Sequence, residues 1–130
     1  MKKKSKISSK SSTELGKEAE ERAFHYFAEQ EDLEVLTRNY RTPYGEIDLI
    51  CYDRGKALVV FIEVRSGCGE NFALCQDSIT AKKRQKITKV ARNFLENLSR
   101  NYEHIRFDAV FIERNEPYRI EHVRDIIMLA

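Results

Sequence analysis

The sequence predicts an α/β fold in which helices flank a central mixed β-sheet. Two segments, at about 11–30 and 80–98, have apolar residues at the three- and four-residue spacing of amphipathic helices. Five shorter segments have the alternation, or the β-branched and aromatic composition, of strands. These elements follow one another in the order helix, three strands, helix, two strands, which predicts a sheet with helices packed against it.

The first predicted helix begins with a capping box, because Ser11 and Glu14 have the S-x-x-E spacing that satisfies backbone N–H groups at a helix start. The helix continues to about Gln30. Apolar residues recur along it at helical spacing: Leu15, Ala19, Ala23, Tyr26 and Phe27.

Three strands are predicted after this helix. Residues 33–40 alternate in polarity, and a turn signal at 42–45 separates them from a second strand at 46–52. A tight turn at 53–56 leads to the β-branched and aromatic segment 57–65. The second and third strands are therefore expected to form a hairpin.

The second half of the chain begins with a predicted loop at 67–78, after which Thr80 caps a long helix. The apolar face of this helix carries Ile87, Val90, Ala91, Phe94 and Leu98. Two further strands are predicted at 106–112 and 118–123, joined by a turn at 115–117.

Charge is distributed unevenly along the chain. Residues 1–12 contain five lysines and no acid, so we expect a disordered basic tail that cannot bury apolar area. The remaining sequence has 18 basic and 21 acidic residues, a net charge of −3. Residues 13–130, in a chain that is 42% hydrophobic, are expected to form a single domain.

The cysteines and the hydropathy pattern predict the compartment. Cys51, Cys68 and Cys75 show neither a C-x-x-C pair nor the spacing of a zinc site, so they are expected to be reduced thiols. The chain has no run of about 18 apolar residues and no apolar stretch behind its N-terminal lysines. We therefore expect a cytoplasmic protein with no membrane association.

Several charged side chains of the hairpin are predicted to share one face. Glu46 and Asp48 lie two residues apart on one strand, as do Glu63 and Arg65 on the next, and alternate residues of a strand point to the same side. A turn centred on residues 54–55 would place Glu46 opposite Glu63 and Asp48 opposite Phe61.

Carboxylates crowded in this way repel each other, and a divalent cation such as Mg²⁺ offsets the repulsion. The alternative is a set of solvated polar residues on the open face of the sheet. The flanking residues favour the metal site, because both strands are strongly apolar and carboxylates within such strands need partners.

The segment from Gly45 to Ile50, followed by Val60 to Arg65, resembles the D...(D/E)-x-K signature of restriction-endonuclease-like nucleases. More closely, the chain resembles the YraN-type family of uncharacterised bacterial proteins, which are similar to archaeal Holliday-junction resolvases. The resemblance extends from about Leu15 to Val123. It includes residues 16–19, 38–41, Lys82 onward and 106–108.

The resemblance implies a restriction-endonuclease-like fold and assigns site residues. It implies that Asp48 and Glu63 bind Mg²⁺ or Mn²⁺, and that Glu18 on the first helix completes the metal site. Arg65 stands where the signature has lysine. Arginine stays protonated, so it supplies charge rather than a general base. Asp108 matches a recurring family position, and either a hydrogen bond or a salt bridge with Arg106 would explain it equally well.

The second helix has a basic surface formed by Lys82, Lys83, Arg84, Lys86, Lys89 and Arg92. Lys82, Lys86 and Lys89 form a stripe at helical spacing. A run of charge is usually a solvated face, but a single-sign stripe without acids favours contact with a phosphate backbone. Arg38 and Arg41 are expected to extend this surface.

Together these features predict a metal-dependent endonuclease that hydrolyses phosphodiester bonds in DNA, with branched or structured DNA as candidate substrates. Asp48, Glu63 and Arg65 are the predicted catalytic residues and Glu46 a supporting one. A non-catalytic nucleic-acid-binding module of the same fold is the alternative, and a protein-interaction domain is a third. The sequence leaves DNA versus RNA open, and a resolvase-like task would suit a homodimer.

Overall fold

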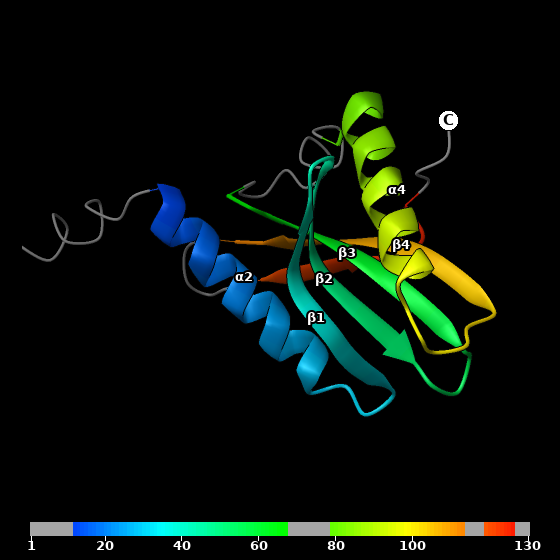
Figure 1. Cartoon of the computed structure of the whole chain (residues 1–130). Helices are drawn as coiled ribbons and strands as arrows, with labels where there is room; N and C mark the ends of the chain where they lie inside the picture. The colour runs from blue at the N-terminus through cyan, green and yellow to red at the C-terminus, as the bar shows by residue number, and fades with distance from the viewer. Residues whose placement is uncertain (1–11, 68–78, 114–118, 127–130) are drawn as a thin grey trace, which may run out of the picture.

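The computed structural model describes residues 12–67, 79–113 and 119–126, which form a five-stranded mixed sheet with a helix against each face (Figure 1). This confirms the predicted α/β class and the predicted order of elements. The capping residue Ser11, most of the basic tail, most of the 67–78 loop and the 115–117 turn lie outside the described residues.

The described elements agree with the predicted ones to within about two residues at most ends. They are α2 (Ser12–Ala28), β1 (Leu33–Thr42), β2 (Gly45–Asp53), β3 (Leu58–Ser66), α4 (Ala81–Glu96), β4 (His104–Ile112) and β5 (Ile120–Val123). The predicted cap of α4 is confirmed, because Lys83 N donates a hydrogen bond to Thr80 Oγ1 at 3.2 Å. No helix of the described residues is long and apolar enough to span a membrane.

The strands lie in the sheet in their order along the chain. β1, β2 and β3 form an antiparallel meander, and β4 pairs antiparallel with β5. β3 and β4 are parallel, so the chain must return from the end of β3 to the edge of the sheet where β3 began before β4 starts. α4 lies in this connection. The strongly apolar β3 is consequently central and covered on both faces.

Alternate residues of the central strands face two separate hydrophobic clusters. On one face, Ala23 and Phe27 of α2 pack in a cluster with Val60 and Ile62 of β3. On the other face, Val90 of α4 belongs to a cluster whose β3 members are Val59 and Phe61. The predicted apolar faces of both helices therefore form the core, and this fixes which side chains of β2 and β3 lie under α4. Cys51 is fully buried in the first cluster, as expected for a free cysteine.

The predicted register of the β2–β3 hairpin is wrong. Its last pair is Asp53↔Leu58, which leaves four residues in the connection instead of a two-residue turn at 54–55. Asp53 Oδ1 accepts a hydrogen bond from Lys56 N at 3.2 Å, and Ala57 has a positive φ of 51°. The side-chain hydrogen bond supports a longer connection than the sequence pattern indicated.

The register error does not change which residues share a face. The observed pairs include Leu49↔Ile62, a shift of two residues from the predicted register, and a two-residue shift keeps the paired side chains, from Leu49 to Asp53 and from Leu58 to Ile62, on their own sides. The ladder ends at Leu49↔Ile62, and just beyond it Asp48 Oδ2 accepts a hydrogen bond from Val64 N, which holds the aspartate against β3.

Candidate functional site

A cavity of about 210 Å³ lies between the hairpin strands and the first half of α4. It is lined by Gly45, Glu46 and Asp48 of β2, Glu63 of β3, and Lys83, Lys86 and Ile87 of α4. Three of the predicted site carboxylates thus meet two of the predicted phosphate-binding lysines. This cavity is the candidate functional site.

Asp48 is partly buried and is held by the neighbouring strand. Its Oδ2 accepts a hydrogen bond from Val64 N at 2.7 Å. Burial first, and then the negative charge of Glu63, raise the pKa of Asp48 to about 7, while the Val64 N–H bond opposes the rise. An ionised Asp48 is therefore unfavourable here unless a cation approaches it.

Glu63 is the more enclosed of the two carboxylates, with its side chain 9% exposed. Its Oε2 lies 2.8 Å from Lys83 Nζ and 3.5 Å from Arg65 NH2. Two cations from different elements thus neutralise one buried carboxylate, as buried charges require. Arg65 Nε is also buried and has no hydrogen-bond acceptor among the described residues.

Lys83 occupies a place that the sequence pattern did not predict. It was assigned to the phosphate-binding surface of the second helix, yet its ammonium group lies beside Glu63 within the cavity. Arg65 stands where the resembled signature has lysine. In space, a lysine is present next to Glu63, but it comes from α4.

The donor set suits a hard divalent ion that keeps part of its water shell. Asp48 and Glu63 line the same cavity and provide carboxylate oxygens, and Mg²⁺ is commonly bound by one or two carboxylates with water and phosphate oxygens. Within the described ranges, no group of three or more His, Cys, Asp and Glu residues is arranged to hold a metal. Asp48 and Glu63 would be two of the ligands of such an ion, with water and substrate oxygens beside them.

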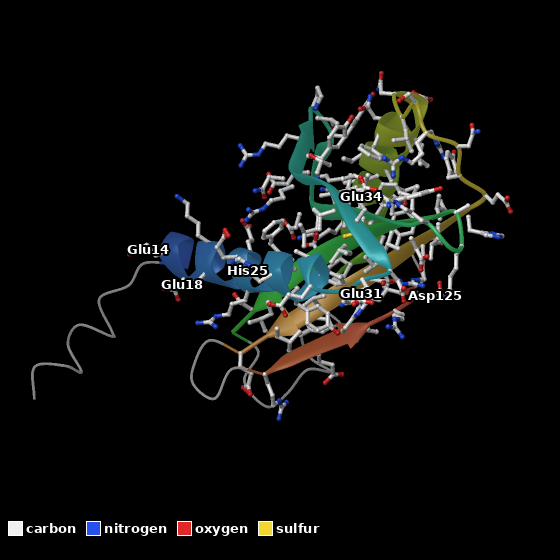
Figure 2. The ribbon with its side chains drawn as sticks, turned by 90° about the horizontal axis from the view of Figure 1, so that it is seen from below. Glu14, Glu18, His25, Glu31, Glu34 and Asp125 are labelled. Atoms are coloured by element: carbon white, nitrogen blue, oxygen red, sulfur yellow. The ribbon has the colours of Figure 1, made fainter. Side chains whose placement is uncertain are left out.

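Glu20 of α2, which the sequence pattern did not single out, acts electrostatically on Asp48, and the role of Glu18 as a metal ligand remains a prediction. The negative charge of Glu20 contributes to raising the pKa of Asp48, and burial together with Glu46 raises the pKa of Glu20 itself. Glu18 is two residues away, about 200° around the helix. Figure 2 shows Glu18 near the start of α2, on the side turned away from β1.

Glu46 connects the cavity to the surface. Its Oε1 forms an ion pair with Arg41 Nε at 2.9 Å, directly across the β1–β2 ladder. The Arg41 side chain is 74% exposed, so this ion pair contributes little to stability but places a positive charge at the rim. Arg38 instead pairs with Glu21 on α2 at 3.0 Å and covers the Phe24 ring.

A family model described as "Uncharacterised protein family UPF0102" matches residues 19–112, more than half of the chain. The chain belongs to this family. The match confirms the resemblance to YraN-type proteins, and it covers every residue that lines the cavity. The name of the family assigns no activity.

Curated UPF0102 proteins from several bacteria are similar over most of their length. The UPF0102 protein of Sulfurihydrogenibium sp. (strain YO3AOP1) is 38% identical over 110 residues, which cover 85% of this chain and 93% of that protein. The UPF0102 protein of Dechloromonas aromatica is 43% identical over 110 residues, 85% of this chain and 88% of the relative. That of Nitrosospira multiformis is 44% identical over 93 residues, 72% of this chain and 76% of the relative.

The basic residues of α4 in this UPF0102 chain do not all face the same way. Lys83 is half-buried and points at Glu63, whereas Lys82, Lys86 and Lys89 are exposed. Lys86 also lines the cavity. Lys89 lies at the β1–β2 turn, with Nζ 5.5 Å from the centre of the Tyr44 ring. Lys86 and Lys89 therefore form an exposed basic surface that runs from the cavity to the β1–β2 turn.

Asp108 does not line the cavity, and its partners are residues of β4, β5 and the segment that follows β5. It is buried, and its two oxygens accept hydrogen bonds from Arg106 at 2.8 and 2.9 Å. His122 Nε2 and Asp125 N lie 2.8 and 2.9 Å from the same carboxylate. These partners lower the pKa of Asp108 against the effect of burial. The predicted salt bridge with Arg106 is confirmed, and the carboxylate ties β4 to the end of the described chain.

A larger hollow of about 980 Å³ lies between α2, β1 and the β2–β3 turn. Glu34, one of the acids along it, forms ion pairs with Arg54 and with Arg100, each at 2.9 Å. It contains neither Asp48 nor Glu63. We therefore place the candidate site in the smaller cavity, where a partly buried carboxylate with a raised pKa lies beside a second acid.

Proposed function

We propose that this protein is a divalent-metal-dependent endonuclease of the restriction-endonuclease-like superfamily that hydrolyses phosphodiester bonds in DNA. The observation that carries the proposal is the pairing of Asp48 and Glu63 in one cavity with Lys83 Nζ 2.8 Å from Glu63. Two carboxylates and a lysine are the chemical groups of the nuclease signature that the sequence resembles, and here three different elements supply them.

In this proposal the two acids hold the metal and the cations hold the phosphate. Asp48 uses Oδ2 for the Val64 N–H bond, so Oδ1 is left as a ligand, and Glu63 supplies the second. A bound Mg²⁺ or Mn²⁺ would lower the pKa of a water molecule and stabilise charge on the scissile phosphate. Lys83 then takes the role of the signature lysine as a compact point charge beside the reacting groups.

Arg65 acts as a positioning residue for Glu63. Its NH2 group lies 3.5 Å from Glu63 Oε2, on the same atom that Lys83 contacts. Arginine remains protonated, so it can orient the Glu63 carboxylate but cannot accept a proton from water. This division of roles explains how a chain with arginine at position 65 retains a complete set of groups.

The exposed basic residues around the cavity are proposed to hold the DNA backbone. Lys86 belongs to the cavity wall, while Lys82, Lys89 and Arg41 lie on exposed surface nearby. Phosphate contacts of this kind give affinity without sequence specificity. We further propose a homodimer for branched substrates, since twofold symmetry would present one cavity to each of two strands.

A nucleic-acid-binding module without cleavage is the second candidate. The observation that favours it is the same 2.8 Å Lys83–Glu63 ion pair, because an ammonium group already neutralises an acid that would bind metal. The two candidates predict different effects of removing this lysine on cleavage and on metal affinity.

The proposal is tested by incubating the purified chain with linear, single-stranded, flap and four-way DNA in Mg²⁺ or Mn²⁺. Metal-dependent cleavage that Asp48→Asn abolishes is the expected result. Asp32→Asn is a matched control, since it makes the same chemical change at an exposed aspartate that does not line the cavity. Absence of cleavage on every substrate, with DNA binding retained, would favour the binding module.

A further inference from the structure

Tyr44 is an exposed aromatic side chain at the edge of the candidate site. Its exposed fraction is 55%, and Tyr102 and Ile105 are the other exposed large hydrophobic residues among those described. The residue that follows it, Gly45, lines the cavity with Asp48 and Glu63. The residue next in sequence to a residue of the cavity lining therefore carries a large exposed aromatic ring.

The local backbone holds Tyr44 in place. Tyr44 N donates a hydrogen bond to Thr42 Oγ1 at 3.1 Å, and the pair Thr42↔Gly45 closes the β1–β2 turn. Gly45 has a φ of 145°, which a residue with a Cβ rarely adopts. A Cβ at Gly45 would lie 3.8 Å from Val90 Cγ2, so the turn rests against α4. An aromatic residue on a turn fixed in this way loses little further freedom on binding a ligand.

The surroundings of the ring are positive. Lys89 Nζ lies 5.5 Å from the ring centre, within the range of a cation–π contact. Lys86, one turn earlier on α4, is exposed and lines the cavity. A flat ring beside lysines that are spaced along a helix matches the arrangement by which proteins bind single strands: aromatic rings stack on bases and basic residues follow the backbone.

We propose that Tyr44 stacks on an unpaired base next to a phosphate held by the lysines of the cavity that Asp48 and Glu63 line, so that the site prefers DNA with single-stranded or unstacked nucleotides. This inference rests on the proposed function and names its substrate class. In an intact duplex both faces of each base are covered by neighbouring pairs, so the Tyr44 ring has nothing to stack on. At a fork, flap or junction a base face is free.

The experiment measures binding by the full chain to three fluorescent DNAs of equal length: a duplex, a single strand and a fork. Titrations are made in EDTA and again with Ca²⁺ in place of Mg²⁺. Tyr44→Ala is expected to weaken binding to the single strand and fork by about tenfold and to leave duplex binding unchanged. Tyr44→Phe keeps the ring and should retain wild-type affinity.

Tyr102→Ala is the matched control, because it removes another partly exposed tyrosine that lines a different groove beside α4 and β4. It should not change any of the three affinities. A 2-aminopurine base at the fork gives a second readout, since stacking on Tyr44 would quench its fluorescence and Tyr44→Ala would restore it. Thermal unfolding of each variant checks that the hairpin stays folded.

Equal losses on duplex and single strand, or no loss with Tyr44→Ala, would overturn the stacking proposal even if metal-dependent cleavage is observed. A selective loss together with an absence of cleavage would support stacking and overturn the nuclease activity. A wild-type chain that binds none of the three DNAs would overturn both.

Discussion

Replacing Asp48 by Asn is expected to stabilise the folded protein above pH 7 while abolishing metal-dependent cleavage. Asparagine keeps a carbonyl oxygen that can accept the Val64 N–H bond, which is 2.7 Å in the structure. It removes a negative charge that burial and Glu63 both disfavour. The substitution should therefore change stability and cleavage in opposite directions, because the ionised residue proposed to bind metal destabilises the metal-free folded protein.

The magnitude follows from the pKa of Asp48, which rises from 3.8 to about 7. A folded-state pKa above the unfolded value means that the folded protein binds the extra proton. Stability therefore falls as pH rises through the interval from about 4 to 7. At 1.36 kcal/mol per pKa unit, ionised Asp48 costs about 4 kcal/mol, of which about 3 kcal/mol should appear between pH 5 and pH 8.

Urea denaturation in EDTA at pH 5 and pH 8 measures this effect. The wild type should lose about 3 kcal/mol relative to Asp48→Asn across that interval, and taking the difference cancels the contribution of the groups that do not interact with Asp48. Excess Mn²⁺ at pH 8 should stabilise the wild type, by about 2.7 kcal/mol at a hundred times its Kd, but not the variant. The reasoning fails if the variant is less stable than the wild type at pH 8, or if the difference is independent of pH.

The remaining predictions concern the cations and the second acid. Glu63→Gln should abolish cleavage but leave DNA affinity nearly intact, as activity and binding assays would show, since the amide keeps the shape and loses the charge. Lys83→Gln should lower the cleavage rate by about a hundredfold and tighten Mn²⁺ binding in calorimetry, because it removes the ion pair with Glu63. If the variant binds Mn²⁺ more tightly but the wild type shows no cleavage, the result favours the binding module. Arg65→Lys should retain activity if only charge is needed, whereas complete loss in the same assay would indicate a need for the planar guanidinium. Replacing Lys82, Lys86 and Lys89 of α4 together by Gln should weaken binding to all DNA sequences. It should also reduce the slope of log affinity against log salt concentration by about one for each lysine that binds a phosphate, and an unchanged slope would exclude this helix surface.

The positions of the helices and strands could be predicted from the sequence because their patterns are long and local. The apolar residues of α4 repeat over several turns, and Thr80 marks its start by a hydrogen bond within the same segment. The strands β2 and β3 are nearly continuous apolar runs. Their register was less predictable, because it depends on the Asp53–Lys56 hydrogen bond and on the positive φ of Ala57 in the turn.

The candidate site was predicted in part. Asp48 and Glu63 could be placed near each other because a hairpin of two neighbouring strands brings the start of one beside the end of the next, and both residues line the same cavity. The choice between Glu18 and Glu20 could not be made in this way. Both flank the buried Ala19 on the helix surface, and the packing of α2 on the sheet decides which flank approaches β2.

Lys83 shows most clearly what local patterns omit. On the helix it continues the same basic run as Lys82, and nothing in the residue types separates the two. Their roles differ because α4 buries Ile87 and Val90 against the sheet, and Lys83 lies one turn before Ile87 on that side. A rotation of about 100° around the helix, the step from one residue to the next, thus determines which of the two lysines faces solvent and which reaches Glu63.

The N-terminal end of α4 lies at the cavity, next to Lys83. The helix begins at the cavity, where its Thr80 cap orders the first turn and its first turn has no acidic residue. The N-terminal end of a helix carries partial positive charge, so it adds to the charge of Lys83 near an approaching phosphate. Further along, Val90 packs against the strands and Lys89 lies beside Tyr44. One helix therefore supplies core packing and the cation next to Glu63, and in the proposed function it would also supply the surface for the DNA backbone. A substitution that tilts α4 should then alter metal binding and DNA binding together, whereas replacing Lys83 should alter mainly metal binding and replacing Tyr44 mainly DNA binding.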